Sequence, residues 1–147
     1  MNRRDLPAVV ATFAPDVELH SPILGRAPFE GRRAVGDLLG AVMTSFDDYT
    51  HTVETGSGDV QVLAYHARVR GREIDVVDLF RMNEAGLVTD ITVHIRPMAG
   101  LASVAAALGP RLARGPVQRV LIATLAAPLA FLLGLAEPLV ARLVRLR

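Results

Sequence analysis

The chain contains no cysteine, no tryptophan and no lysine, and two of these absences narrow its function. Without cysteine it has no disulfides and no thiolate metal ligands, and nothing points to an oxidising compartment. The five Phe and two Tyr leave few rings for stacking on bases, so nucleic-acid binding is disfavoured. All sixteen basic residues are arginine, which fits a bias towards arginine codons and indicates no function.

Metal and cofactor sites are also not expected. The four histidines, at positions 20, 51, 66 and 94, lack the spacing typical of metal ligands. No glycine-rich loop opens a helix in the way that phosphate-binding loops do. The N-terminus has no long apolar run before its first acidic residues, so it does not resemble a secretory signal. We therefore expect a cytoplasmic protein without metal or cofactor.

Charge divides the chain into two parts. Residues 1–109 carry ten Arg and fourteen acidic residues, a net charge of −4, whereas residues 110–147 carry six Arg and one acid, a net charge of +5. This change marks a composition boundary near Gly109-Pro110. We expect a domain over residues 1–100 and an apolar, Arg-flanked C-terminal helical extension over residues 101–147. Within the extension, the pair Gly109-Pro110 is expected to kink or break a helix over residues 101–114.

Apolar periodicity predicts an α+β fold, in which helices come first and an antiparallel meander follows. Leu6 to Phe13 reads as a short helix, and apolar residues at helical spacing predict an amphipathic helix over residues 34–46. Alternating residues predict strands at 17–21, 49–55, 60–70, 73–82 and 87–96, and residues 22–31 read as a loop.

The segment 116–147 is apolar and flanked by arginine, and three interpretations remain open. It could be a helix that packs on the domain or on a partner, a helix that lies on a membrane surface, or a membrane span. Residues 120–136 carry no charge, but a helix of that length spans only about 26 Å, against about 30 Å for a bilayer core.

One carboxylate stands out on the strand IDVVDLFRM (74–82). Every second residue of this strand is apolar except Asp78, so a strand with one face on the core would point Asp78 inward. Burial among apolar neighbours disfavours the anion and would raise the pKa of Asp78. Asp78 is therefore either a polar group in a pocket or a structural acid that is hydrogen-bonded to the backbone or to an arginine.

Three motifs, FAPDVELHSP (13–22), FEGRRAV (29–35) and VVDLFRMNEAGLVTDITV (76–93), occur in an order that resembles the nuclear transport factor 2-like superfamily. The likeness is to its bacterial branch of SnoaL-like cyclases and ketosteroid isomerases, and it covers about residues 5–100. It implies a cone-shaped curved sheet around helices with an apolar pocket at its open end. Relative to the family, the chain lacks the usual first helix.

The resemblance also implies a role for Asp78, and it shows which catalytic groups of the family this sequence does not match. In ketosteroid isomerases, an acid at the position of Asp78 stays protonated and donates a hydrogen bond to the developing enolate oxygen. The general base of that reaction corresponds to Ser21, which is a poor base without an activating partner. The family's phenolic donor belongs to the absent helix, so the catalytic set is incomplete.

The alternation of side chains along each strand predicts which other residues line the pocket and which face outward. The predicted pocket residues are Asp78, Tyr65, Ser21, Phe80, Ile91 and Val93. On the last strand, Thr89, Ile91, Val93 and Ile95 should face inward, whereas Asp90, Thr92, His94 and Arg96 should face a dimer interface or solvent. His20 alternates with Ser21 and so should point outward, although a bent strand end would bring it to the pocket mouth.

Three functions follow as hypotheses. The first is a protein that binds a small hydrophobic molecule, with Asp78 as its polar anchor. The second is a SnoaL-like enzyme that transfers protons on a polyketide-like or steroid-like substrate, with Asp78 as acid and Ser21 or His20 assisting. The third is an interaction or membrane-associated module that uses its C-terminal helices. A homodimer, formed through the outer sheet face or those helices, is expected in each case.

Overall fold

The computed structural model describes residues 6–25, 27–113, 115, 128, 131–140 and 142–144. The elements, in chain order, are α1 (Leu6–Ala11), β1 (Phe13–His20), β2 (Phe29–Glu30), α2 (Gly31–Met43), β3 (Phe46–Ser57), β4 (Val60–Val69), β5 (Arg72–Met82), β6 (Val88–Arg96) and α3 (Met98–Leu112). Residues 131–140 and 142–144 are helical as well. The predicted α+β class is confirmed.

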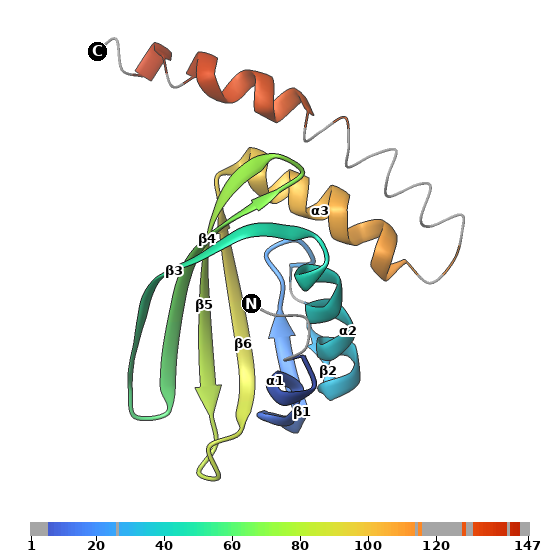
Figure 1. The fold of residues 1–147 in the computed structure, drawn as a ribbon, viewed down its shortest axis with the longest axis vertical. Helices are drawn as coiled ribbons and strands as arrows, with labels where there is room; N and C mark the ends of the chain where they lie inside the picture. Colours follow the sequence, from blue (N-terminus) through green and yellow to red (C-terminus); the bar gives the residue numbers. More distant parts are fainter. Residues whose placement is uncertain are drawn as a thin grey trace.

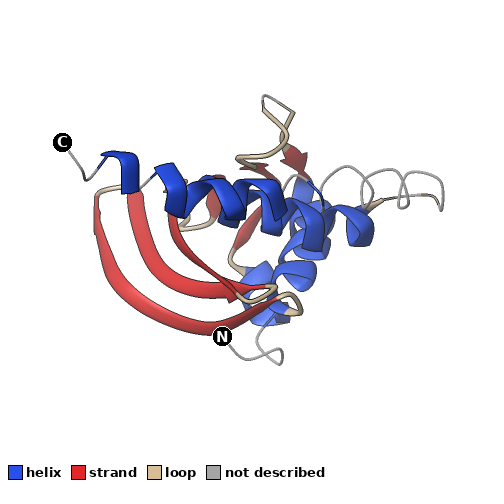
Figure 2. Ribbon diagram, turned by 90° about the horizontal axis from the view of Figure 1, so that it is seen from above, coloured by secondary structure: helices blue, strands red, loops and turns tan. Residues whose placement is uncertain are grey.

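All six strands form one curved, open sheet in the order β2-β1-β6-β5-β4-β3. Strands β3 to β6 are the predicted antiparallel meander, whereas β1 pairs with β6 in parallel, so the sheet is mixed. Figures 1 and 2 show the long strands curling around the helices, with α2 inside the curve and α3 across one end of the sheet. This arrangement is the predicted cone.

Two tight turns set the register of the meander. Arg70 and Gly71 both have positive φ, at 51° and 78°, and they join the paired residues Val69 and Arg72. This is the conformation of a two-residue hairpin turn whose twist matches that of the strands. The predicted turn at Asn83 to Gly86 is also present, and there the Asn83 side chain accepts hydrogen bonds from two backbone N–H groups, each at 3.0 Å.

Helix α3 lies very close to the sheet because its buried face is made of small residues. A Cβ atom added at Gly100 would lie 2.5 Å from Cγ2 of Ile74, so only glycine permits this approach. Ile74 is 1% exposed and belongs to the main core. The boundary expected at residue 100 therefore falls inside a helix that packs on the domain.

Gly109-Pro110 was predicted to kink or break this helix; the break is wrong, because α3 continues to Leu112. Proline has no N–H to donate to the carbonyl four residues earlier. In this structure the oxygen of Ala106 instead accepts a hydrogen bond from Arg70 Nη1, at 3.4 Å. A side chain from a neighbouring strand turn thus satisfies the carbonyl that Pro110 leaves free.

Several other boundaries differ from the prediction. The helix expected over 34–46 spans Gly31–Met43, and Phe46 begins β3 instead, since it packs on the core equally well from a strand. Phe13 likewise begins β1 rather than ending α1, and β2 occupies part of the predicted loop. A bulge in β6 changes the expected parity, because Met82 pairs with Val88 and Arg81 with Asp90. Val88 therefore faces inward in place of Thr89, whose hydroxyl donates to the oxygen of Arg81.

The interpretations of residues 116–127 lie outside the described residues. No helix of the described chain is long and apolar enough to cross a membrane.

Candidate ligand-binding cavity

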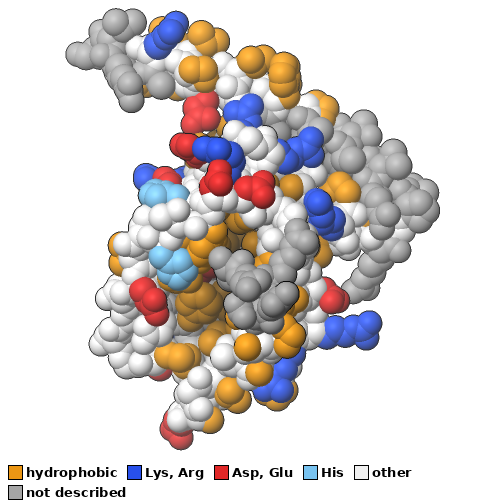
Figure 3. Space-filling model, viewed as in Figure 1, with side chains coloured by type: hydrophobic (Ala, Val, Ile, Leu, Met, Phe, Trp, Pro, Cys, Tyr) orange, Lys and Arg blue, Asp and Glu red, His pale blue; other side chains and the backbone are white. Residues whose placement is uncertain are grey.

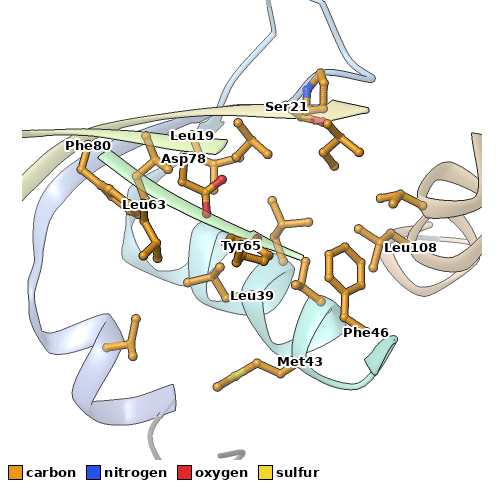
Figure 4. Close-up of a pocket in the computed structure, with 18 of the residues that line it drawn as sticks. Leu19, Ser21, Leu39, Met43, Phe46, Leu63, Tyr65, Asp78, Phe80 and Leu108 are labelled. Carbon is orange, nitrogen blue, oxygen red and sulfur yellow. The ribbon is translucent and has the colours of Figure 1, made fainter. Parts of the chain in front are cut away.

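A cavity of about 350 Å³ opens between the concave face of the sheet and the helices (Figure 4). Side chains from α1, α2, α3 and from every strand except β2 line it, and most of them are apolar. The polar side chains among the described lining residues are Thr12, Ser21, Tyr49, His51, Tyr65 and Asp78. A mainly apolar cavity of this size with a few polar groups is typical of small-molecule sites.

Alternation along β5 brings Asp78 into this cavity. Asp78 faces inward with Val76 and Phe80, and it pairs with Leu63 on β4 and Val93 on β6. The carboxyl group is therefore surrounded by apolar neighbours on its own strand and on both adjacent strands. Figure 4 shows it pointing into the cavity, towards Tyr65.

The Asp78 carboxyl lacks a complete set of hydrogen bonds. Its Oδ1 atom is buried and has no hydrogen-bond partner among the described residues. Burial raises the pKa of Asp78 from 3.8 to about 7, although an interaction with the Tyr65 hydroxyl lowers it in part. Near neutral pH, a large fraction of this carboxyl is therefore protonated and able to donate a hydrogen bond.

Two tyrosines extend the polar side of the cavity. The rings of Tyr49 and Tyr65 are 4.5 Å apart at an interplanar angle of 35°, and the His51 ring meets Tyr49 edge-on at 5.0 Å. Burial, and then the charge of Asp78, raises the pKa of Tyr49 to about 12 and also raises the pKa of Tyr65. Both phenols therefore remain protonated at neutral pH and can donate hydrogen bonds.

The structure brings all six predicted pocket residues to the lining of this one cavity: Asp78, Tyr65, Ser21, Phe80, Ile91 and Val93. It adds Tyr49 and His51, to which the sequence assigned no role. The signal for this pair was available, because residues 49 and 51 share one face of a predicted strand.

Ser21 and His20 are separated, as strand parity predicts. Ser21 lines the cavity, where its oxygen accepts a hydrogen bond from the Ile23 N–H at 3.2 Å. The imidazole of His20 instead lies 2.9 Å from Asp90 and 3.6 Å from Glu18. His20 is not among the lining residues, so in this structure it does not activate Ser21.

The Glu18, His20 and Asp90 group was not expected from the sequence. One ligand atom from each lies within 4.8 Å of the others, which is close enough for a metal ion, although Nε2 of His20 already contacts Asp90 directly.

The convex face of the sheet carries charged pairs. Asp75 contacts His66 and lies 2.8 Å from Arg96. Desolvation acts to raise the pKa of Asp75, but the hydrogen bonds from His66 and Arg96 lower it overall. The Arg68 guanidinium forms ion pairs with Asp48, at 2.9 Å, and with Glu73, at 3.2 Å. These groups are largely exposed, and the dimer expected on this face stays a prediction.

Comparison with known proteins agrees with this architecture. The sequence profile of the SnoaL-like domain matches residues 1–91. A steroid delta-isomerase from Pseudomonas aeruginosa is 34% identical, with a TM-score of 0.70 over 75% of this chain and 81% of the isomerase. An uncharacterised protein with a cystatin-like fold from Silicibacter pomeroyi DSS-3 is 28% identical, with a TM-score of 0.70 over 74% and 77% of the two chains.

A more distant structure shares the fold alone. SalBIII, an epoxide hydrolase/cyclase-like enzyme of pyran ring formation in the polyether salinomycin, is 19% identical with a TM-score of 0.54, over 65% of this chain and 81% of its own. No curated protein matches the chain. From the matched profile, the isomerase and the cone-shaped fold, we conclude that the chain belongs to the SnoaL-like family of the nuclear transport factor 2-like superfamily, a ligand-binding or isomerase-type family.

Proposed function

We propose that the protein binds a small, mainly apolar molecule that carries one hydrogen-bond acceptor, such as a ketone oxygen. The observation that supports this most directly is that the Asp78 carboxyl, whose buried Oδ1 has no partner among the described residues, lines an apolar cavity. An unpartnered buried polar atom is costly, and a ligand oxygen placed opposite a protonated carboxyl would remove that cost.

The lining sets the expected shape of the ligand. A volume of about 350 Å³ lies at the lower end of the range for small-molecule sites, which favours a compact ring system over a long chain. The adjacent Tyr49 and Tyr65 rings, tilted by 35° to one another, offer an aromatic surface beside Asp78. The acceptor oxygen of the ligand would therefore lie at the Asp78 end, and its apolar rings would contact the rest of the lining.

An isomerase-type enzyme is the second candidate, and the similarity to the steroid delta-isomerase favours it. Its chemistry would use Asp78 as the acid that donates to a developing enolate oxygen. It also needs a base that removes a carbon-bound proton. Ser21 has no activating partner within hydrogen-bond distance among the described residues, so His51 is the described cavity side chain that offers a basic nitrogen for this role.

The binding proposal is tested with two probes that differ in one oxygen. Tetralone is a bicyclic ketone, and tetralin is the corresponding hydrocarbon. Isothermal titration calorimetry should show that the protein prefers tetralone, and native mass spectrometry should show one molecule bound per chain. The preference should be lost in Asp78→Ala and retained in Asp78→Asn, because the amide of Asn still donates a hydrogen bond.

Ser21→Ala is the matched control, because Ser21 lines the same cavity without being part of the proposed anchor. An equal preference for tetralone in wild type and Asp78→Ala would remove Asp78 from the site. The enzyme candidate is tested separately with a β,γ-unsaturated ketone, by following the ultraviolet absorbance of the conjugated product. Turnover that His51→Ala abolishes would replace the binding proposal with the enzyme.

A further inference from the structure

The C-terminal helical segment presents an unusually apolar surface. Seven large side chains on residues 131–144 are each 54–71% exposed: Phe131, Leu132, Leu135, Leu139, Val140, Leu143 and Val144. We call this set the C-terminal apolar face. Figure 3 shows hydrophobic side chains gathered along the segment, which lies beyond α3 in Figure 1. Contiguous apolar surface of this kind marks a binding site for a protein or a membrane.

The opposite side of the same helix contacts the domain. The Arg72 guanidinium lies against the backbone of Gly134, so closely that an added Cβ would meet its Nη2 at 1.8 Å. Glu137 lines a crevice together with Arg72 and Gly100. The helix therefore has a defined orientation, in which the apolar face points away from the domain.

Charge decides between the possible occupants of this face. Residues 110–147 carry six Arg and a single acid, Glu137, and that acid lies on the side that contacts the domain. A segment of net positive charge thus carries an apolar face that points away from the domain. An anionic lipid surface satisfies both features, since its acyl chains accept the leucines and its headgroups attract arginine.

A second copy of the chain would satisfy only one of these features. Two apolar faces could pack together, but the two segments, each with a net charge of +5, would then repel one another. Elsewhere in the described chain, the exposed large apolar residues are Ile23, Leu24, Val53, Val77 and Met98. Ile23 and Leu24 are neighbours in one loop, and Val53 and Val77 both align with Ala64 of β4, so these residues form groups smaller than the seven-residue C-terminal apolar face.

We propose that the C-terminal apolar face binds the surface of an anionic membrane, with the leucines at the level of the acyl chains and the net positive charge of the segment attracted to the headgroups. This inference does not depend on a ligand in the cavity. It assigns to the C-terminal segment a role that the cavity does not explain.

The absence of tryptophan provides a clean assay. In full-length Phe131→Trp, the introduced indole is the sole tryptophan and lies on the proposed contact surface. Its emission should shift to the blue when vesicles of phosphatidylcholine with about 30% phosphatidylglycerol are added, and the protein should sediment with them. Adding Leu135→Glu and Leu139→Glu should weaken this partitioning by at least about tenfold, because two apolar contacts become charged.

Val53→Glu is the matched control, since Val53 is 51% exposed on β3, outside the C-terminal apolar face. It should leave partitioning unchanged. Absence of a blue shift with anionic vesicles would overturn the proposal, as would equal binding to phosphatidylcholine alone. A blue shift without vesicles, with a dimer in native mass spectrometry that Leu135→Glu and Leu139→Glu dissociate, would overturn it in favour of a second copy.

Discussion

Replacing Asp78 with asparagine should make the stability of the protein less dependent on pH. The folded state holds the Asp78 proton more tightly than the unfolded chain does, because burial raises the pKa from 3.8 to about 7. A group of this kind destabilises the folded state progressively as the pH rises from the unfolded to the folded pKa. Asparagine is nearly isosteric and does not titrate, so Asp78→Asn removes this dependence.

The expected magnitude follows from the size of the pKa shift. A shift of about three units corresponds to about 4 kcal/mol over the whole titration. About 3 kcal/mol of this falls between about pH 5 and about pH 8.5, where other carboxylates change little. Over that interval, the free energy of unfolding of Asp78→Asn should rise by about 3 kcal/mol relative to the wild type.

Urea denaturation at several pH values measures this difference. Tyr49 and Tyr65 are the two tyrosines of a chain without tryptophan, and both line the cavity, so tyrosine fluorescence reports unfolding at the site itself. Asp37→Asn is the control, because Asp37 is exposed on α2 and is not among the lining residues. A difference between Asp78→Asn and the wild type that stays constant across the pH range would refute the reasoning.

Three further predictions concern packing, the surface and the proposed site. Gly100→Ala should lower the free energy of unfolding by about 1–3 kcal/mol, because its Cβ would overlap Ile74. Gly40→Ala is the control and should not lower it, since a Cβ added there would lie at an ordinary contact distance of 3.4 Å from Cδ2 of Leu6. Thermal unfolding followed by circular dichroism compares the two variants. Asp75→Asn should lower the free energy of unfolding by about 1 kcal/mol or less at neutral pH. Urea denaturation should show this difference vanish as the pH falls through the lowered pKa of Asp75, because the wild-type carboxylate then loses its contacts as well. In calorimetry, tetralone affinity should fall by about tenfold per pH unit above about pH 8, where Asp78 has lost its proton, and should stay constant in Asp78→Asn; an unchanged wild-type affinity would contradict a donor role.

Much of the meander could be predicted because its signals are local. Strands β4 and β5 were predicted to within one residue at each end, since alternation and turn residues define them in the sequence. The same alternation placed Asp78 and Tyr65 on the inner face. A side chain's orientation towards the cavity is therefore readable wherever a regular strand carries it.

The features that could not be predicted depend on contacts distant in the sequence. The parallel pairing of β1 with β6 joins residues that are about seventy positions apart. Helix α3 continues past Pro110 because Arg70, from another element, satisfies a carbonyl. The bulge near Thr89 exchanges which residue faces the core, and no residue in that stretch signals it.

The unpaired atom of Asp78 also bears on the choice between its two interpretations. A structural acid would be hydrogen-bonded within the protein, because burying an unsatisfied oxygen costs about 1–3 kcal/mol without any gain. Oδ1 instead has no partner among the described residues, and the carboxyl faces a cavity large enough for a small molecule. A ligand acceptor opposite a protonated Asp78 would lower this cost and, by linkage, hold the proton more tightly. The instability at high pH and the proposed affinity for a ketone thus have one origin, so a ligand that binds through Asp78 must also raise its pKa.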